Sequence, residues 1–281
     1  MPYASVRDIL NCADENGFAA AAVDIINYET ALWVVKAAEA ERLPVILMFY
    51  PGMKTFIPLD AISWICRRLA EGSEVPVGVH MDHCGSFEDS VAGLRDGFES
   101  VMFDGSALPF EENVAVTSRA AQCAHIFGAG LEAELGHVGS GSSREDFLNA
   151  DSYTDPELAR EFIEKTGADY LAVAIGNSHG FYVCEPSLDI GRLCEINKKV
   201  GAPLVLHGGS GIPPEQVRES VKYGINKVNI ATEIMVKCKD SMAASLALDG
   251  FIIERLEKAG EEVTGLVRER MRWINPSGYR L

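Results

Sequence analysis

The chain has 281 residues, of which 47% are hydrophobic and 23% charged, and its 41 acidic and 25 basic side chains give a formal net charge of −16. This acidity argues against nucleic acid and anionic membranes as partners, because both bind proteins through clustered Lys and Arg. No segment resembles a membrane-spanning helix or a signal peptide, and the seven cysteines form no CxxC pair. We therefore expect a soluble, cytoplasmic protein.

Short apolar runs rich in Val, Ile and Leu alternate with helical patterns along the chain, as in βαβ units around a parallel sheet. There are eight such runs, at residues 19–23, 45–49, 77–81, 100–103, 131–135, 170–175, 204–206 and 227–230. Eight parallel strands in a chain of this length predict an α/β fold, the (β/α)8 or TIM barrel. A doubly wound open sheet is the alternative, but no GxGxxG motif follows the first run.

The helical patterns have recognisable ends. Ser86, with Asp89 three residues later, resembles a capping box, and the helix that starts at Pro156 can be capped by Asp155 and ended by Gly167. After the eighth run the sequence remains helical in pattern. We expect one barrel domain over residues 1–281, with residues 233–281 as a helical C-terminal extension that closes the barrel's exterior or contacts another subunit.

Polar residues gather where the predicted strands end, which is where this fold carries its catalytic groups. They are Asp24, Asp82, His83, Asp104, Glu132, Glu134, His179, His207 and Asn229. Three imidazoles around an open fourth position are a ligand set for catalytic zinc, although each histidine alone could equally be a surface or core residue. Asp82 could act as a general acid or base, or could instead orient an imidazole.

Small residues follow the seventh and eighth strands, at residues 208–211 and 229–232. Such residues let backbone N–H groups approach a ligand, and these two loops are the usual phosphate site of a TIM barrel. A glycine-rich turn can also be only a tight connection. Beside a metal site, the segments predict a phosphate-binding cradle.

Six segments, in chain order, resemble the class II, zinc-dependent ketose-bisphosphate aldolases, most closely the branch that contains tagatose-bisphosphate aldolases. They are residues 81–83, 102–106, 131–136, 172–180, 206–211 and 227–232. The resemblance implies a lyase that reversibly cleaves a ketose 1-phosphate or 1,6-bisphosphate, fructose- or tagatose-bisphosphate-like, into dihydroxyacetone phosphate and an aldehyde. It also implies a homo-oligomer, a dimer or tetramer.

The resemblance assigns roles to particular residues. His83, His179 and His207 would hold Zn²⁺, and Asp82 would exchange a proton with the aldehyde oxygen. Asp104 and Glu134 would line the metal pocket and hold an alternative zinc position. The ketone-side phosphate would lie against Gly180, Gly208, Gly209, Ser210, Asn229, Ile230, Ala231 and Thr232, with a monovalent cation, Na⁺ or K⁺.

Two departures concern the rest of the site. The loop at residues 136–150 looks a few residues longer than in relatives, and Glu145 is the candidate for the base that removes the carbon-bound proton. Asp24 replaces the usual Asn as a substrate-binding residue, so the aldehyde need not be phosphorylated.

Lys227 is expected at the start of its strand, away from the mouth, which disfavours a Schiff-base mechanism.

Two other functions are weighed against the aldolase. One is a non-catalytic, phosphosugar-binding partner subunit of an aldolase complex, and the other is a metal-independent isomerase that binds phosphate. The presence of Asp82 and all three histidines counts against both, because neither function needs them.

Overall fold

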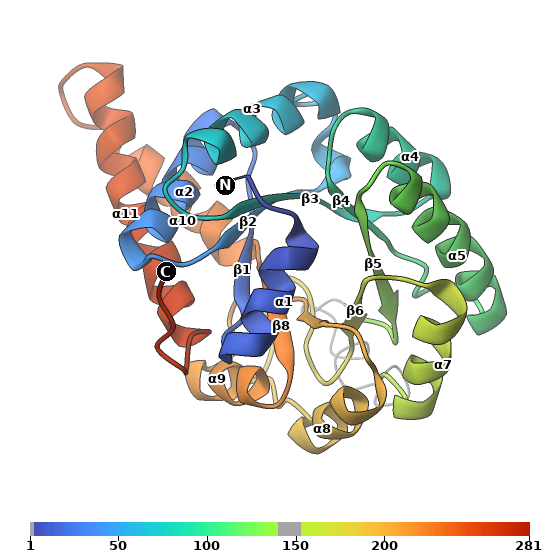
Figure 1. Ribbon diagram of the computed structural model, residues 1–281. Coiled ribbons are helices and arrows are strands. Elements are labelled where there is room, and N and C mark those ends of the chain that lie inside the picture. Colours follow the sequence, from blue (N-terminus) through green and yellow to red (C-terminus); the bar gives the residue numbers. More distant parts are fainter. Residues whose placement is uncertain (1–2, 140–152) are drawn as a thin grey trace.

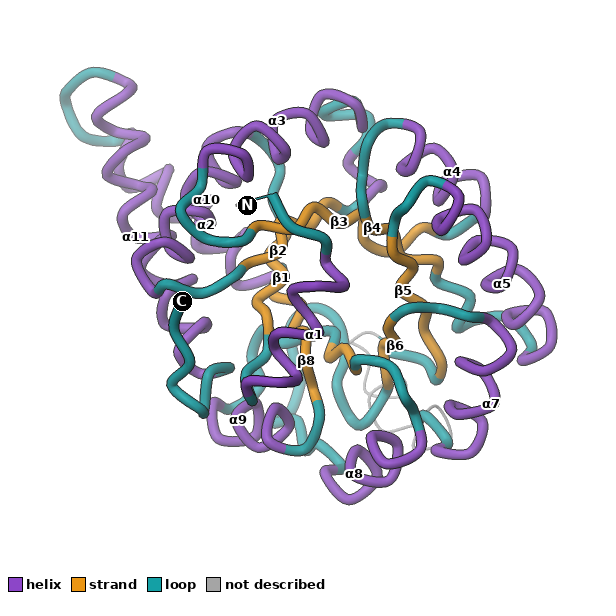
Figure 2. The backbone as a smooth tube through the Cα atoms, viewed as in Figure 1, coloured by secondary structure: helices purple, strands orange, loops and turns teal. Residues whose placement is uncertain are grey.

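The structure, a computed structural model, describes residues 3–139 and 153–281. Eight parallel strands form a closed barrel in sequence order, with β8 paired to β1. The strands make the inner ring and the helices surround it (Figure 2). Their bounds are β1 (Ala20–Asp24), β2 (Val45–Phe49), β3 (Val77–Cys84), β4 (Ser100–Phe103), β5 (Gly130–Leu135), β6 (Tyr170–Val173), β7 (Leu204–Leu206) and β8 (Ile225–Ile230). The predicted (β/α)8 barrel is confirmed.

The helices begin and end largely where the sequence signals lie. The described helices are α1 (Val6–Asn16), α2 (Tyr28–Glu41), the short 3-10 helix η1 (Pro51–Met53), α3 (Leu59–Gly72), α4 (Phe87–Arg95), α5 (Phe110–Ile126), α7 (Pro156–Thr166), α8 (Ile190–Lys199), α9 (Pro214–Lys222), α10 (Thr232–Leu246) and α11 (Ile252–Trp273). Ser86 caps α4, and Asp155 caps α7, which Gly167 ends in a left-handed conformation. None of these helices is long and apolar enough to cross a membrane.

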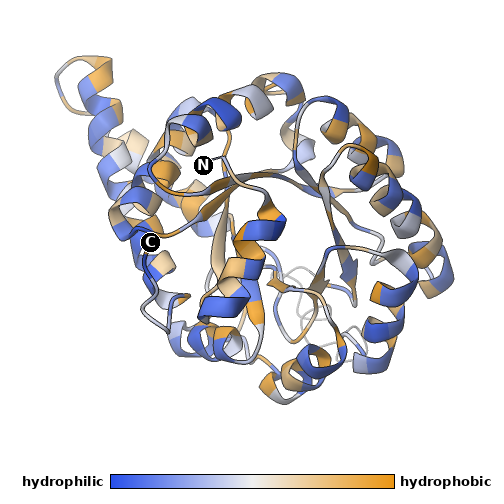
Figure 3. Cartoon of the chain, in the orientation of Figure 1, coloured by the Kyte–Doolittle hydropathy of each residue, from blue (hydrophilic) through white to orange (hydrophobic). Residues whose placement is uncertain are grey.

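The strands are buried on both faces, as expected for a parallel sheet that is covered by helices. Hydrophilic and hydrophobic stretches alternate along the outer helices (Figure 3), because one side of each helix packs on the strands. Inside the barrel, small and medium apolar residues such as Ala20, Ala22 and Met48 pack with Val6 and Leu10 of α1. Helix α1 lies across the opening at the N-terminal ends of the strands (Figure 1). Among the described residues, α1 thus covers this end of the barrel.

The two C-terminal helices pack against each other, and α11 also packs on α2. Gly260 of α11 lies so close to the Trp33 ring that a Cβ atom there would be 2.2 Å from Trp33 Nε1. The end of α10 and the start of α11 project from the barrel (Figure 1). Leu248 and Phe251 of the joining segment and Ile253 of α11 are exposed there. Part of the predicted C-terminal extension, residues 233–281, thus packs on the outside of the barrel. Its status as an extension of a single barrel domain stays a prediction.

Candidate active site

A cavity of about 630 Å³ lies at the C-terminal ends of the strands. Eleven predicted site residues line it: Asp24, Asp82, His83, Asp104, His179, Gly180, Gly208, Ser210, Asn229, Ala231 and Thr232. His207 and Glu134 lie beneath its surface, within reach of the other candidate ligands. Glu145 lies outside the described residues. Segments from most of the chain thus contribute to a single site, as the barrel topology requires.

An irregularity in β3 turns two consecutive side chains into this cavity. The pairing of β3 with β4 shifts register between Met81 and Cys84, and His83 has a φ of 40°. In a regular strand Asp82 and His83 would point to opposite faces of the sheet. A left-handed conformation is costly for a residue with a Cβ atom, and such strain is characteristic of functional sites. The bulge lets both side chains face the cavity.

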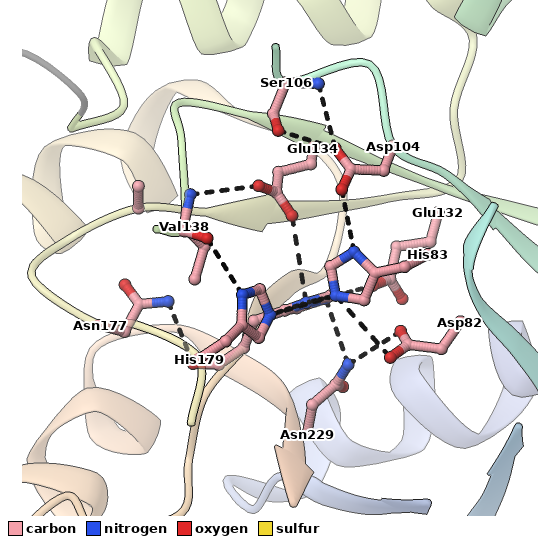
Figure 4. Close-up of polar contacts among 12 residues, drawn as sticks. Asp82, His83, Asp104, Ser106, Glu132, Glu134, Val138, Asn177, His179 and Asn229 are labelled. Carbon is pink, nitrogen blue, oxygen red and sulfur yellow. Dashed lines mark hydrogen bonds and ion pairs between the residues drawn. The ribbon is translucent and has the colours of Figure 1, made fainter. Parts of the chain in front are cut away.

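The three predicted zinc ligands converge. His83 Nε2 lies 3.1 Å from His179 Nε2 and 2.9 Å from His207 Nδ1, and the latter two nitrogens are 3.4 Å apart. Figure 4 shows His83 and His179 with their Nε2 atoms turned toward each other, and Asp82 and Glu134 beside them. Two nitrogens bound to one zinc ion at tetrahedral angles would lie about 3.3 Å apart. The observed spacing fits that requirement.

Each imidazole is oriented by a partner at its outer ring nitrogen. His83 Nδ1 lies 3.0 Å from Asp104 Oδ2, and His179 Nδ1 donates to the Val138 carbonyl oxygen at 3.0 Å. His207 Nε2 donates to Glu132 Oε1 at 2.8 Å. These bonds leave the inner nitrogens as lone-pair donors, which is the tautomer a metal needs. The donor set therefore fits a zinc ion.

The pKa values of the three imidazoles are consistent with a shared metal site. Burial and the neighbouring His83 lower the pKa of His179 to about 4, and burial lowers the pKa of His207 well below its usual value. Burial also acts against protonation of His83, but Asp82 and the hydrogen bond with Asp104 raise the pKa of His83 to about 10. The lone pairs of three converging ring nitrogens would repel one another, and either a proton on His83 or a bound metal ion relieves that repulsion.

Asp104 and Glu134 provide a second set of candidate ligands with His83. Burial, followed by the Asp104 charge, raises the pKa of Glu134 to about 8. Glu134 Oε1 accepts a hydrogen bond from Val138 N at 3.2 Å, but the buried Oε2 has no partner. A buried oxygen without a partner is costly unless a ligand satisfies it. The position suits the predicted alternative zinc site.

Asp82 faces the same cavity beside the histidines. It is only 5% exposed, and its Oδ2 lies 3.8 Å from His83 Nε2. The Asn229 side-chain amide donates to Asp82 Oδ1 at 3.2 Å. The second carboxylate oxygen is therefore left to face a ligand in the cavity. Asn229 was predicted to bind phosphate, and the structure shows it holding Asp82.

The predicted phosphate cradle is formed by three loops. Helix α10 begins at Thr232, directly after Ala231, and both residues line the cavity. The N-terminal end of a helix favours an anion. Ser210 Oγ accepts from Glu233 N at 3.3 Å and keeps its own proton to donate. Gly208 has a φ of 64°, and a Cβ atom there would lie 2.0 Å from Ser178 O. Only glycine therefore fits that position.

Two of the residues predicted to contact phosphate are not among those that line the cavity, and their role stays a prediction. The Gly209 N–H group donates to the Asn229 carbonyl oxygen at 2.9 Å, so it is already used between the two loops. The Ile230 side chain is 3% exposed and packs in the hydrophobic core. Neither residue lines the cavity. Gly209 instead allows close packing, because a Cβ atom there would lie 2.6 Å from Val228.

Asp24 lies at the end of β1, where it pairs with Met48 of β2. It is 7% exposed, and its Oδ1 has no hydrogen-bond partner. Burial and the nearby Asp82 charge raise the pKa of Asp24 well above its usual value. A neutral carboxyl group in this place can both donate to and accept from a hydroxyl group of a ligand.

The sequence reasoning missed several residues of the site. His137 was placed away from the mouth, but it lines the cavity next to the loop that holds His179. The carbonyl group of Val138 leaves no signal in a sequence, because any residue supplies one. Glu132 was noted at a strand end without a role, and Lys227 was expected at the start of its strand. Both are wholly buried inside the barrel.

Comparison with known proteins agrees with this geometry. Residues 4–279 match the family model described as class II fructose-bisphosphate aldolase. The chain is 39% identical over 252 residues to a probable fructose-bisphosphate aldolase of Bacillus subtilis, covering 88% of this chain and 87% of that protein.

Two solved structures have the same architecture. The YdjI aldolase of Escherichia coli K12 gives a TM-score of 0.89 at 33% identity, covering 99% of this chain and all of that one. A putative fructose-1,6-bisphosphate aldolase of Coccidioides immitis gives 0.85 at 26% identity, covering 96% of each chain. The likeness extends over the whole barrel.

Proposed function

Because the chain belongs to the class II fructose-bisphosphate aldolase family, we propose that it reversibly cleaves a ketose 1-phosphate or 1,6-bisphosphate into dihydroxyacetone phosphate and an aldehyde. The protein is an enzyme of the lyase class, and its family is zinc-dependent in general. One observation carries the proposal: three imidazole nitrogens lie within 3.4 Å of one another beside the Asp82 carboxylate.

His83, His179 and His207 would hold the zinc ion, with Asp104 and Glu134 at the alternative position. When bound, zinc acts as a Lewis acid that polarises the substrate's carbonyl oxygen. This chemistry replaces a Schiff-base lysine. Lys227 is buried against Glu132 and does not line the cavity, which supports the exclusion of a lysine mechanism.

Asp82 would transfer the proton at the aldehyde oxygen. During cleavage its free oxygen accepts the proton of the C4 hydroxyl group, the C3–C4 bond breaks, and the bonding electrons stay with the three-carbon ketone fragment. That fragment then takes a proton at carbon, for which Glu145 remains the proposed group. In condensation the same groups act in reverse.

The ketone-side phosphate would bind at the loops after β6, β7 and β8. Gly180, Gly208, Ser210, Ala231 and Thr232 all line this part of the cavity. No Lys or Arg among the described residues lines it, so backbone N–H groups and the helix end would provide the positive potential. This requirement supports the predicted monovalent cation, Na⁺ or K⁺.

The aldehyde half would lie near Asp24, Met48 and Tyr50. The unpartnered oxygen of Asp24 suits a hydroxyl group, and no Lys or Arg among the described lining residues is available to pair with a second phosphate. The products formed from each aldehyde would identify the sugar and distinguish a fructose-type from a tagatose-type configuration.

The test is a condensation assay with zinc, dihydroxyacetone phosphate and matched aldehydes with and without phosphate. We expect products with zinc, none after treatment with a chelator, and recovery when zinc is restored. The His83→Ala variant should be inactive. Full activity of that variant would exclude the mechanism, and binding of dihydroxyacetone phosphate without turnover of any aldehyde would favour the non-catalytic partner subunit.

The predicted homo-oligomer has a candidate contact at the tip of the C-terminal helices. Phe251 is 80% exposed and Ile253 67%, which is unusual for large apolar side chains grouped on one segment. Light scattering of the purified protein, compared with a Phe251→Ser variant, tests whether this tip joins two copies of the chain.

A further inference from the structure

A buried carboxylate lies directly beneath the candidate metal site. Glu132 of β5 accepts two hydrogen bonds. Its Oε1 accepts one from His207 Nε2 at 2.8 Å, and its Oε2 accepts one from the Lys227 ammonium group at 2.7 Å. All three side chains are 0% exposed. The lysine therefore reaches His207, the most deeply buried of the three candidate metal ligands, through a single carboxylate and without any contact with solvent.

The strand geometry explains why these residues meet. Alternate residues of a strand point to the same face, so Glu132 and Glu134 of β5 both point into the barrel, and so do Lys227 and Asn229 of β8. Glu134 and Asn229 occupy the layer at the mouth. Glu132 and Lys227 occupy the layer below, which places their charged groups under the histidines.

The hydrogen bonds in this layer have a defined direction. An ammonium group can only donate, so Glu132 Oε2 must accept from Lys227, and Oε1 remains as the acceptor for His207. His80 Nε2 lies 3.7 Å from Oε2, and its Nδ1 is 2.7 Å from Ser100 Oγ. With Ser100 donating to Nδ1, the Nε2 proton of His80 also points to the carboxylate. At 3.7 Å His80 Nε2 makes no hydrogen bond, and the Asn229 amide nitrogen lies 3.2 Å from His207 Nε2. Among the described residues, Lys227 and His207 are therefore the two whose side chains hydrogen-bond to Glu132.

We propose that Lys227 is a positioning residue for the metal site. By anchoring Oε2 of Glu132, it keeps Oε1 directed at His207 Nε2, which holds the His207 ring with its Nδ1 lone pair toward His83 and His179. Lys227 does not line the cavity, so this role involves no contact with substrate. The inference rests on the proposed zinc site, but it requires no particular sugar.

The first test is the Lys227→Met variant, which keeps most of the side-chain volume and removes the ammonium group. Losses of about 10–100-fold in metal affinity are typical when the orienting partner of a ligand is removed, and we expect a loss of that size for zinc in competition with a chelator. The Arg268→Met variant is the control, because Arg268 also pairs with a buried carboxylate, Glu41, but on the outer helices. It should leave zinc affinity unchanged.

A second readout separates positioning from simple stabilisation. In ¹⁵N-labelled metal-free protein, the wild-type His207 ring should carry its proton at Nε2, whereas Lys227→Met should show a mixture of tautomers. A folded Lys227→Met variant with wild-type zinc affinity and only the Nε2 tautomer would overturn the proposal.

Two double variants keep the test decisive if the single variant does not fold. Both Glu132→Gln/Lys227→Met and Glu132→Leu/Lys227→Met remove the two charges together, but only glutamine retains an oxygen that can accept from His207. The glutamine variant should bind zinc at least tenfold more tightly than the leucine variant. Equal affinities would overturn the proposal. Tight zinc binding without aldolase activity would instead contradict the proposed function alone.

Discussion

At the scale of single residues, the site depends on the conformation of the β3 bulge. His83 is one of only two non-glycine residues with positive φ in the described part of the chain. The bulge brings His83, the proposed metal ligand, and Asp82, the proposed proton-transfer group, into one cavity from adjacent positions. Metal binding and proton transfer can therefore be separated by substitution, although the two residues are neighbours in sequence.

The first prediction concerns Asp82. Replacing it with Asn keeps the volume of the side chain but removes the group that exchanges a proton with the substrate oxygen. General acid–base groups typically contribute about 10²–10⁴-fold to the rate, so kcat should fall by that range. Zinc content, measured on the same preparation, should stay at the wild-type level. Turnover within a fewfold of wild type would contradict the assignment.

The second prediction concerns Gly208. A Cβ atom here would approach Ser178 O to 2.0 Å, and the backbone φ of 64° is strained for any other residue. We expect Gly208→Ala to raise the KM for dihydroxyacetone phosphate more than it lowers kcat, because the cradle shifts while the zinc ligands remain. Gly201→Ala is the control, since a Cβ atom there meets nothing within 4 Å. Equal KM values for the two variants would count against the cradle.

At the scale of elements, one buried carboxyl group is among the contacts that join α1 to the barrel. Glu99, just before β4, accepts hydrogen bonds from Val6 N in the first turn of α1, at 3.1 Å, and from Val79 N of β3, at 3.2 Å. Burial raises the pKa of Glu99 to about 8. Helix α1 closes the lower end of the barrel, so this contact links the protonation of Glu99 to the stability of the fold.

The third prediction is a pH dependence of stability. In the unfolded chain a glutamate has a pKa of about 4.3, so between that value and about 8 the unfolded state releases a proton that the folded state keeps. The free energy of unfolding should fall as pH rises through this window. The Glu99→Gln variant should show a flatter profile in urea unfolding at pH 5, 6.5 and 8. Parallel profiles for the two proteins would contradict the assignment.

At the scale of the whole molecule, the net charge of −16 opposes the approach of a phosphorylated substrate. Net charge acts over long distances and is screened within about 8 Å at physiological ionic strength. The phosphate contacts proposed here are local. Charge and function are therefore compatible, and the acidity still argues against nucleic acid as a partner.

The fourth prediction follows because the repulsion by the net charge acts at long range, whereas the proposed phosphate contacts act at short range. Raising the ionic strength from about 10 mM to about 150 mM shortens the Debye length from about 30 Å to about 8 Å, so the KM for the anionic substrate should fall. Choline chloride should reproduce this effect of screening, and KCl or NaCl should lower KM further if a monovalent cation binds beside the phosphate. A KM that rises with choline chloride would contradict the argument.

The sequence alone determined the architecture and identified most of the residues that line the candidate site. Eight apolar runs between capped helices specify a (β/α)8 barrel, because strand and helix periodicity are local properties. Residue types at the strand ends were also readable, and the resemblance to a family gave the three histidines and Asp82 their roles. A glycine-rich turn was enough to suggest a phosphate site, although it could not show which N–H groups are free.

Only the tertiary structure decided how those residues are held. His83 and His179 are 96 positions apart, and Glu132 and Lys227 are 95 apart, so the closed barrel alone brings each pair together. In the closed barrel the Gly209 N–H group donates to the Asn229 carbonyl oxygen of the neighbouring loop, and the Ile230 side chain packs in the core. Hydrogen-bond direction and burial depend on neighbours from distant segments, and these neighbours are fixed by packing rather than by local sequence.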